Sequence, residues 1–432
     1  MRKFNLLFVV FVAFMSQAHA QAIIAPVVPS VLKEAAPETA GMSADRLARI
    51  DQLFKDYVDK KWLPSVTAMI VRDGKIVYYK TAGYDNPDKK SSLHKGDIYR
   101  IASQSKAITS VAVMILYEEG RLLLDDPISK YIPEFKKPQV LDSLNMKDTT
   151  YTTKPAKREI TIRDLLTHTS GIGYAQIGDD KMNAIYGKQN IPSGIGVEPG
   201  KLLATEIKKL AKLPLMHEPG AKFTYGLNTD VLGYLIEVVS GKSFYDFLRE
   251  RIFEPLGMED TYFYLPKKKY DRLTTVTLED STGHIIVVKP TYHGFNVNYP
   301  NTPGTYFSGG AGLSSTAYDY AIFLQMMLNG GIYNGHRILS RNAVRMMTMS
   351  QIGDTPYGEN TFGLGFGIIT EKGSARLPVR EGSYEWGGYW GTNYWVDPKE
   401  RLVGQIMTQH EDNTHGDVFD KFKVLVYQAI ND

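Results

Sequence analysis

The sequence of 432 residues contains no cysteine. This absence excludes disulfides, thiolate-ligated zinc, iron–sulfur clusters, a thiol nucleophile and cysteine-linked lipid anchors. An excess of charge of one sign is also lacking, because 50 Lys and Arg residues nearly balance 47 Asp and Glu residues, for a net charge of +3. A chain so close to neutrality has no strong electrostatic attraction for nucleic acid, and we expect no nucleic-acid partner. Composition therefore removes several kinds of chemistry without selecting one.

Long hydrophobic runs are rare, and the run at the N-terminus is short. Arg2 and Lys3 precede apolar residues 6–15, and the pattern Ala18-His19-Ala20 follows. A membrane anchor is the alternative interpretation, but crossing a bilayer takes roughly 20 apolar residues. The pattern is typical of a secretory signal peptide over residues 1–20, cut after Ala20. We therefore expect a periplasmic or secreted protein with no membrane anchor after cleavage.

Local patterns indicate how the folded part begins. Residues 21–44 contain several prolines and read as an N-terminal arm, and apolar residues at helical spacing follow Ser43, an expected N-cap. Val66–Val71 and Lys75–Tyr79 are rich in β-formers and flank Asp73-Gly74. This arrangement is typical of a β-hairpin.

Strand patterns return near the C-terminus, whereas the middle of the chain has helical periodicity. The expected late elements are three strands and a final helix, over residues 363–369, 392–396, 402–407 and about 417–430. We therefore expect one domain over residues 45–432, in which a sheet is built from both ends of the chain. Its α/β part would cover about 45–121 and 304–432, with a mostly helical insertion over about 122–303.

A nucleophile has to be sought among Ser, Thr, Lys and carboxylates, because cysteine is absent. No serine lies in a Gly-x-Ser-x-Gly pattern, the nine histidines form no His-Glu-x-x-His motif, and Gly309–Gly312 lacks the lysine of a phosphate loop. We therefore predict neither a metal nor an organic cofactor. The remaining pattern, Ser-x-x-Lys, begins at Ser30, Ser92 and Ser103.

Only Ser103 opens an amphipathic helix, whose apolar face is formed by Ile108, Val111, Ala112, Ile115 and Leu116. There Lys106 lies one turn along on the same face, where its amine can take the proton of the hydroxyl. The N–H groups at the start of the helix favour developing negative charge. On context alone, a helix cap with a solvated Lys106 is an equal alternative.

Several longer motifs accompany this pair, at residues 101–106, 119–128, 161–172, 223–233 and 255–258. Together they resemble the serine β-lactamase-related family, which includes class C β-lactamases, penicillin-binding D-Ala-D-Ala peptidases and β-lactamase-like carboxylesterases. The resemblance runs from about Asp45 to the C-terminus. It implies an α/β (α+β) fold of the β-lactamase/DD-peptidase type, with an antiparallel sheet flanked by helices and an inserted, mostly helical domain.

The resemblance also implies roles for individual residues. Ser103 matches the acylated nucleophile, Lys106 its partner base, and Tyr225 the tyrosine that moves a proton between nucleophile, leaving group and water. The backbone N–H groups of Ser103 and Tyr389 would form the oxyanion hole.

Two departures from the family pattern bear on the substrate. The second motif usually reads Tyr-x-Asn, but Leu227 takes the third place and Asn228 follows one position late. The strand motif, normally Lys-Thr-Gly or His-x-Gly, is Trp386-Gly387-Gly388, which resembles the esterase variant and lacks the cation that holds a lactam or peptide carboxylate. Arg380 is nearby in sequence, but no sequence feature indicates that it takes this place.

Aromatic residues cluster around this strand, at Tyr384, Trp386, Tyr389, Trp390, Tyr394 and Trp395. Alternation predicts that about half of them face the cleft and the others pack the sheet. We predict Trp386, Gly387, Gly388 and Asn228 as substrate-binding residues. An aromatic cleft without a fixed cation favours an uncharged ester.

The sequence thus predicts a serine hydrolase that acts through an acyl-enzyme on a small ester or amide, a carboxylesterase more than a β-lactamase, with acyl transfer to an alcohol as a neighbouring activity. One alternative is a class C-type β-lactamase or D-amino-acid peptidase. The other is a cell-wall-binding protein without catalysis. The oligomeric state is not predicted.

Overall fold

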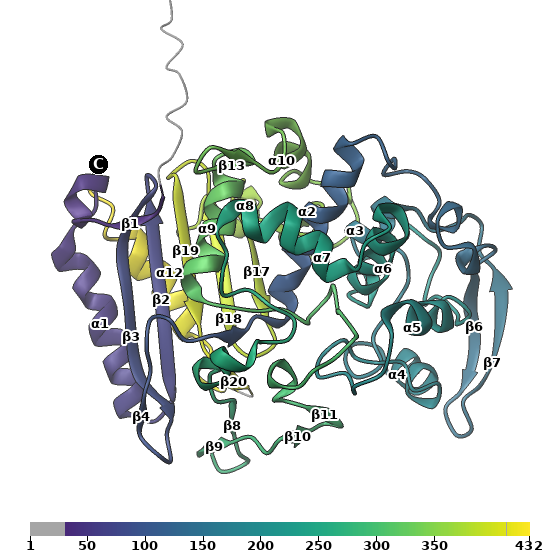
Figure 1. The fold of residues 1–432 in the computed structure, drawn as a ribbon, viewed down its shortest axis with the longest axis horizontal. Coiled ribbons are helices and arrows are strands. Elements are labelled where there is room, and N and C mark those ends of the chain that lie inside the picture. The colour runs from purple at the N-terminus through teal and green to yellow at the C-terminus, as the bar shows by residue number, and fades with distance from the viewer. Residues whose placement is uncertain (1–30, 412) are drawn as a thin grey trace, which may run out of the picture.

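The structure is a computed structural model that describes residues 31–411 and 413–432. The predicted signal peptide and residues 21–30 of the predicted arm lie outside the described residues. A nine-stranded sheet forms one half of the molecule (Figure 1). Its order is β1 (Lys33–Glu34), β3 (Lys75–Asn86), β2 (Ser65–Arg72), β19 (Leu402–Met407), β18 (Thr392–Asp397), β17 (Tyr384–Gly388), β16 (Gly367–Ile368) and β15 (Thr361–Phe362), with β4 (Ser91–Ser92) paired to β3. All neighbours are antiparallel except β1 and β3.

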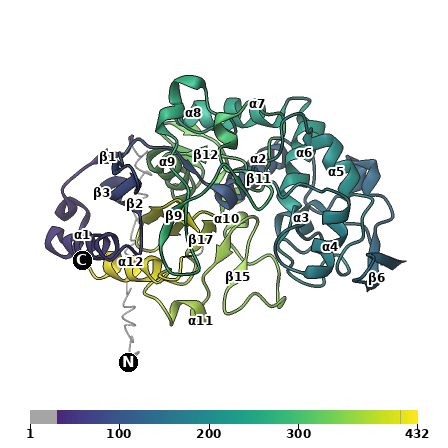
Figure 2. The ribbon, with the colours of Figure 1, turned by 90° about the horizontal axis from the view of Figure 1, so that it is seen from below.

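The two ends of the chain meet in the middle of this sheet, where β2 pairs with β19 and Met69 lies opposite Gln405. All eight residues of β2 are buried, because helices cover both faces. On one face, α1 (Ala44–Asp59) and α12 (Val418–Tyr427) lie side by side (Figure 2) and pack on alternate β2 residues such as Ala68. On the other face, α9 (Ala317–Leu328) and α2 (Ser105–Glu118) pack on the intervening residues.

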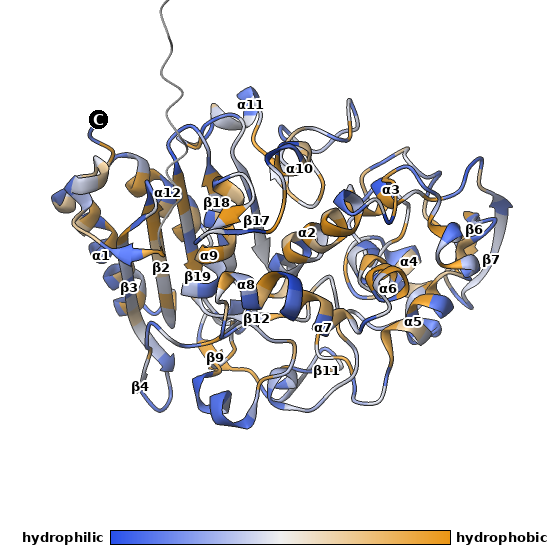
Figure 3. Ribbon diagram, turned by 45° about the horizontal axis from the view of Figure 1, so that its top comes forward, coloured by the Kyte–Doolittle hydropathy of each residue, from blue (hydrophilic) through white to orange (hydrophobic). Residues whose placement is uncertain are grey.

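The other half of the molecule is mostly helical and is joined to the sheet through α2. Its elements are α3 (Ile162–Leu166), α4 (Asp180–Lys188), α5 (Leu203–Leu210), α6 (Asn228–Ser240), α7 (Phe244–Leu248) and α8 (Glu254–Leu256), with a hairpin of β6 (Gln139–Asn145) and β7 (Thr150–Pro155) at the far end. Hydrophobic residues concentrate on α2 and α6 (Figure 3), which pack on each other in the core. None of the helices in residues 31–411 and 413–432 is both long and apolar enough to cross a membrane.

Short strand pairs and helices fill the boundary between the halves and the upper rim of the sheet. They are β5 (Tyr99–Arg100) with β12 (Ser314–Ser315), β20 (His410–Glu411) with β8 (Thr277–Glu279) and β9 (Ile285–Val287), β10 (Thr291–Tyr292) with β11 (Phe295–Asn296), β13 (Ile332–Tyr333) with β14 (His336–Arg337), and the helices α10 (Arg341–Met347) and α11 (Glu371–Ser374).

The structure confirms the predicted fold class and several local expectations. Ser43 caps α1 by accepting a hydrogen bond from the N–H of Arg46, and Asp73-Gly74 forms a two-residue hairpin turn in which both residues have positive φ. The single strand predicted over 363–369 is wrong. Gly365 has φ +91°, and a side chain there would meet Ser110 Oγ at 2.2 Å, so the chain turns against α2 and forms the two short strands β15 and β16. The last helix, α12, is shorter than predicted.

Candidate active site

Ser103 lies at the junction of the two halves, in a 3-10 turn (Ala102–Gln104) that leads into α2. Its side chain is half-buried, whereas Ala102 and Gln104 are fully buried. The turn is held from outside, because Ile101 N–H donates to Leu313 O at 3.1 Å. The predicted position of Ser103 at the start of a helix is therefore confirmed, and the helix dipole points its positive end toward the hydroxyl.

Lys106 is 2% exposed, and its amine is directed at Ser103. Nζ donates to Ser103 Oγ at 3.2 Å, to the Tyr174 hydroxyl at 3.0 Å and to Gly310 O at 2.8 Å. These three contacts hold the amine in place beside the hydroxyl. The alternative of a helix cap with a solvated Lys106 is thus wrong, because the amine is buried and bonded to the candidate nucleophile.

Tyr225 completes the group that the sequence predicts. Its ring centroid lies 4.5 Å from Lys106 Nζ, and its hydroxyl accepts a hydrogen bond from Trp386 Nε1 at 3.4 Å. Gly226 permits this placement, since a Cβ there would lie 2.0 Å from Ile172 O. The structure therefore brings Ser103, Lys106, Tyr225 and Trp386 together from three distant parts of the chain.

Tyr174 was missed by the sequence reasoning. It is buried, its hydroxyl contacts Lys106, and its ring packs 5.5 Å from that of Tyr225. Burial holds the pKa of Tyr174 well above its ordinary value, and electrostatic coupling to Tyr225 and Asp230 acts in the same direction. Tyr174 thus stays a neutral hydroxyl beside the lysine. The available signal was its position directly after the 161–172 motif.

Asp230 is a second buried group near the lysine that the sequence did not single out. Burial raises its pKa to about 6, against the opposing effects of the Ser308 hydroxyl and the charge of Lys106. A Cβ on Gly310 would lie 2.5 Å from Asp230 Oδ2, so the carboxyl group packs directly on the peptide whose carbonyl binds Lys106. Asp230 therefore helps to fix the Gly309–Gly312 loop against the site.

The structure contradicts the substrate-binding role predicted for Asn228. Its side chain is fully buried; Oδ1 accepts from Ser170 Oγ at 2.5 Å, and Nδ2 lies 2.9 Å from His168 Nδ1. Burial, followed by the nearby charge of Lys106, lowers the pKa of His168 well below its ordinary value. Because Asn228 begins α6 and faces the 168–172 segment, it connects two core elements.

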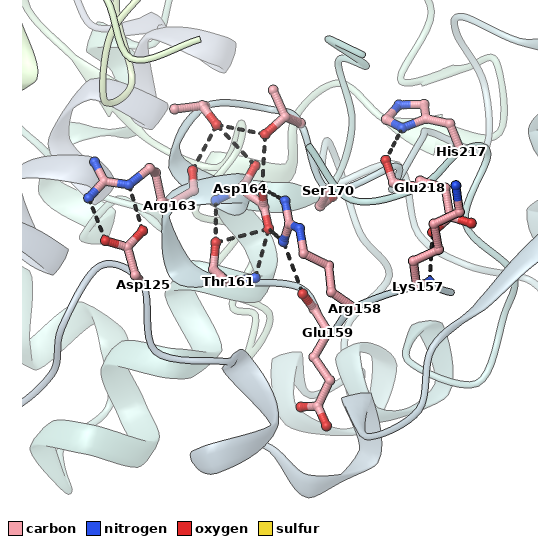
Figure 4. A network of polar contacts seen from close by, with 12 residues as sticks. Asp125, Lys157, Arg158, Glu159, Thr161, Arg163, Asp164, Ser170, His217 and Glu218 are labelled. Atoms are coloured by element: carbon pink, nitrogen blue, oxygen red, sulfur yellow. Dashed lines mark hydrogen bonds and ion pairs between the residues drawn. The ribbon is translucent and has the colours of Figure 1, made fainter. Parts of the chain in front are cut away.

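A polar network on α3 stabilises residues 168–174, the segment that follows this helix (Figure 4). Thr161 and Asp164 form a reciprocal capping box. The Asp164 carboxylate also accepts two hydrogen bonds from Arg158, at 2.5 and 2.8 Å, and one from Thr169 Oγ1 at 3.2 Å. This network fixes the entry to the segment that carries His168 and Tyr174.

The strand motif lies against the turn that carries Ser103. A Cβ on Gly388 would lie 2.5 Å from Ile101 O, so glycine allows β17 to approach the nucleophile closely. Of the six aromatic residues near this strand, Tyr384, Trp390, Tyr394 and Trp395 are fully buried, so fewer than half are available to the cleft. The side chain of Arg380 is 56% exposed and pairs with Glu400 at 2.6 Å.

A cavity of about 320 Å³ opens beside Ser103, between the two halves of the molecule. Its walls include Tyr174, Tyr389, Ile177, Ile195 and Phe295. Among the described residues, no Lys or Arg lines it. A larger hollow of about 680 Å³, by Trp62 and Tyr84, contains none of the predicted site residues.

Comparison with known proteins agrees with this geometry. A model of the Beta-lactamase family matches residues 50–429. The chain belongs to this family. Protein Rv1367c of Mycobacterium tuberculosis (strain ATCC 25618 / H37Rv) is 32% identical over 373 residues, which cover 82% of this chain and 88% of that protein. Esterase EstB of Burkholderia gladioli is 28% identical over 384 residues, or 85% and 91% of the two chains.

The solved structures give the same fold. "EstCE1, a hydrolase with promiscuous acyltransferase activity" superimposes with a TM-score of 0.76 at 24% identity, covering 89% of this chain and 99% of that one. The family match makes the protein a serine hydrolase of the β-lactamase-related type, as the sequence predicted.

Proposed function

We propose that this member of the Beta-lactamase family is a carboxylesterase that acts through an acyl-enzyme on Ser103. The observation that carries the proposal is the indole of Trp386, which binds the Tyr225 hydroxyl at the place where a β-lactamase or peptidase has a cation for the substrate carboxylate. The adjoining cavity also lacks Lys and Arg among the described residues. An uncharged ester suits such a site better than a carboxylate-bearing lactam. The name of EstB, an esterase, supports the same choice.

The proposed reaction has two steps. In the first, Ser103 Oγ bonds to the ester carbonyl carbon and loses its proton to Lys106, while the N–H groups of Ser103 and Tyr389 stabilise the oxyanion. The C–O bond to the alcohol then breaks, Tyr225 supplies the proton that the alcohol carries away, and the proton taken up by Lys106 passes to Tyr225. In the second step, water bonds to the acyl carbon and loses a proton to Lys106. The bond from that carbon to Ser103 Oγ then breaks, the proton returns to Ser103, and the acid is released. An alcohol in place of water would give acyl transfer.

The test is turnover of 4-nitrophenyl acyl esters and of a chromogenic cephalosporin by wild type and Ser103→Ala, together with intact mass. We expect ester turnover with an acyl adduct in wild type, both lost in Ser103→Ala, and slow use of the cephalosporin. Ser92→Ala is the matched control, because Ser92 also begins a Ser-x-x-Lys pattern but is exposed on β4. Fast cephalosporin turnover would instead indicate a β-lactamase. If neither substrate reacts and no mass is added, a non-catalytic cell-wall-binding protein is favoured.

We also propose that the protein is exported to the periplasm or the medium, on the N-terminal pattern of residues 1–20. Terminal sequencing of the protein from its native host tests this directly. Export predicts a chain that begins at Gln21, and an intact N-terminus would contradict it.

A further inference from the structure

The proposed chemistry divides the site into two sides. Tyr225 delivers the proton to the departing alcohol, so the alcohol has to leave on the side of Tyr225 and Trp386, whose rings lie 5.6 Å apart. The cavity of about 320 Å³ instead includes Ser103 and Tyr389, the two residues whose N–H groups would hold the carbonyl oxygen, and Tyr225 and Trp386 lie outside it. The acyl group, which is bonded to the carbonyl carbon on the side away from the alcohol, therefore points into the cavity.

The lining of the cavity is mixed. The polar side chains of Gln176, Ser193 and His293 share it with the apolar side chains of Ile177, Ile195 and Phe295. Phe295, on β11, and Ile195 belong to the apolar residues packed against a small core cluster that contains Ala102 and Trp390. The ring of Phe295 lies 6.0 Å from that of Trp390, which in turn lies 4.8 Å from the ring of Tyr389. Phe295 therefore forms an apolar wall that rests on the layer beneath the candidate oxyanion hole.

The two segments that bear these side chains are locked together through their backbones. A Cβ on Gly196 would lie 2.6 Å from Asn296 O, so the loop that carries Ile195 and the β10–β11 hairpin touch directly. The hairpin itself closes through His293 and Gly294, both with positive φ. The two segments therefore form one continuous wall of the cavity.

We propose that this cavity is the pocket for the acyl group of the ester. It takes uncharged aliphatic acyl groups, which are either unsubstituted chains or branched ones. Phe295 sets the length of chain that it accepts. The inference rests on the proposed function. An apolar cavity of about 150 Å³ holds the six carbons of benzene. By this ratio, a cavity of about 320 Å³ holds an acyl group of about twelve carbons, the carbonyl carbon included.

The test compares two families of esters that place the same chain on opposite sides of the carbonyl. Ethyl hexanoate and hexyl acetate are isomers, so differences in their use report orientation and not hydrophobicity, and longer homologues extend both series. In wild type, kcat/KM should rise about fourfold per added acyl methylene up to about twelve carbons and then level off. Lengthening the alcohol should have a much smaller effect.

Phe295→Ala should let the rise in kcat/KM continue to longer acyl chains and leave the alcohol series unchanged. Tyr292→Ala is the matched control, because Tyr292 lies on the same hairpin and packs on the same cluster without lining the cavity. Ile195→Trp should act in the opposite direction and shift the preference toward acetate. It also gives an answer if Phe295→Ala fails to fold.

Three results would overturn the assignment: a change in the alcohol series, an equal effect of Tyr292→Ala, or unchanged acyl profiles in both cavity variants. These results differ from failure of the proposed function itself, in which wild type would hydrolyse no ester of either series and form no acyl adduct.

Discussion

At the scale of single residues, the amine of Lys106 contacts more groups than Ser103, the partner that the sequence predicts. Its three acceptors come from Ser103, from Tyr174 and from the backbone of Gly310. Replacing one acceptor leaves a buried donor unpaired, so each contact should influence how readily the amine exchanges its proton.

Tyr174→Phe keeps the ring and removes the hydroxyl that contacts Lys106. We expect kcat/KM for an ester to fall roughly ten- to a hundredfold, the usual cost of a hydrogen bond to a charged group. Steady-state kinetics with one ester measure the change. Tyr333→Phe is the control, since the Tyr333 hydroxyl is bonded to Leu32 N–H. An unchanged kcat/KM in Tyr174→Phe would reduce Tyr174 to a packing residue.

Asn228→Ala separates the role predicted from sequence from the role that the structure supports. Since the amide joins His168 and Ser170 in the core, its loss should reduce the free energy of unfolding by roughly 1–3 kcal/mol. KM for esters should change little in the folded enzyme. Urea unfolding and steady-state kinetics measure the two quantities. A large rise in KM without a loss of stability would restore the substrate-binding role.

At the scale of elements, α3 is short, and its five residues depend on their capping network for stability. We expect Asp164→Ala to lower the free energy of unfolding by about 2 kcal/mol, because it removes the capping box and leaves Arg158 without its carboxylate. The 168–174 segment should loosen with it, and kcat/KM should fall as well.

Asp125→Ala is the matched control for Asp164→Ala. Asp125 also pairs with an arginine of this region, Arg163, but its side chain is 71% exposed, so its loss should cost less than about 1 kcal/mol. Equal effects of the two substitutions in urea unfolding would mean that burial of the network contributes nothing.

Local signals were sufficient to predict most elements but not the complete site. Capping residues and turn residues act over three or four positions, so Ser43 and Asp73-Gly74 were read correctly. Tyr174 and Gly310 lie 68 and 204 residues from Lys106, and no spacing rule connects them to it. Asn228 was assigned wrongly because a shift of one position on the turn into α6 directs the amide into the core.

At the scale of the whole molecule, both ends of the chain form the sheet, and α2 and α9 fill the space between the sheet and the helical half. This dense boundary buries carboxyl groups such as that of Asp319, which forms no ion pair with a lysine or arginine of residues 31–411 and 413–432. Asp319, on α9, accepts hydrogen bonds from Asp260 N–H at 2.7 Å and from the Thr261 hydroxyl at 3.0 Å. Burial raises its pKa to about 7.

A buried carboxyl group of this kind makes the stability of the molecule depend on pH. Between about pH 4 and 7, the unfolded chain releases the proton of Asp319 while the folded protein retains it, so stability falls with rising pH by at most about 1.4 kcal/mol per unit. Asp319→Asn keeps an acceptor oxygen and cannot ionise. Relative to wild type, the variant should therefore become progressively more stable from pH 4 to 7, with a constant difference above that range. Urea unfolding at several pH values measures this difference, and the value at pH 4, where the carboxyl group is protonated, is the internal reference. A difference that stays flat across the range would show that Asp319 is ionised in the folded protein.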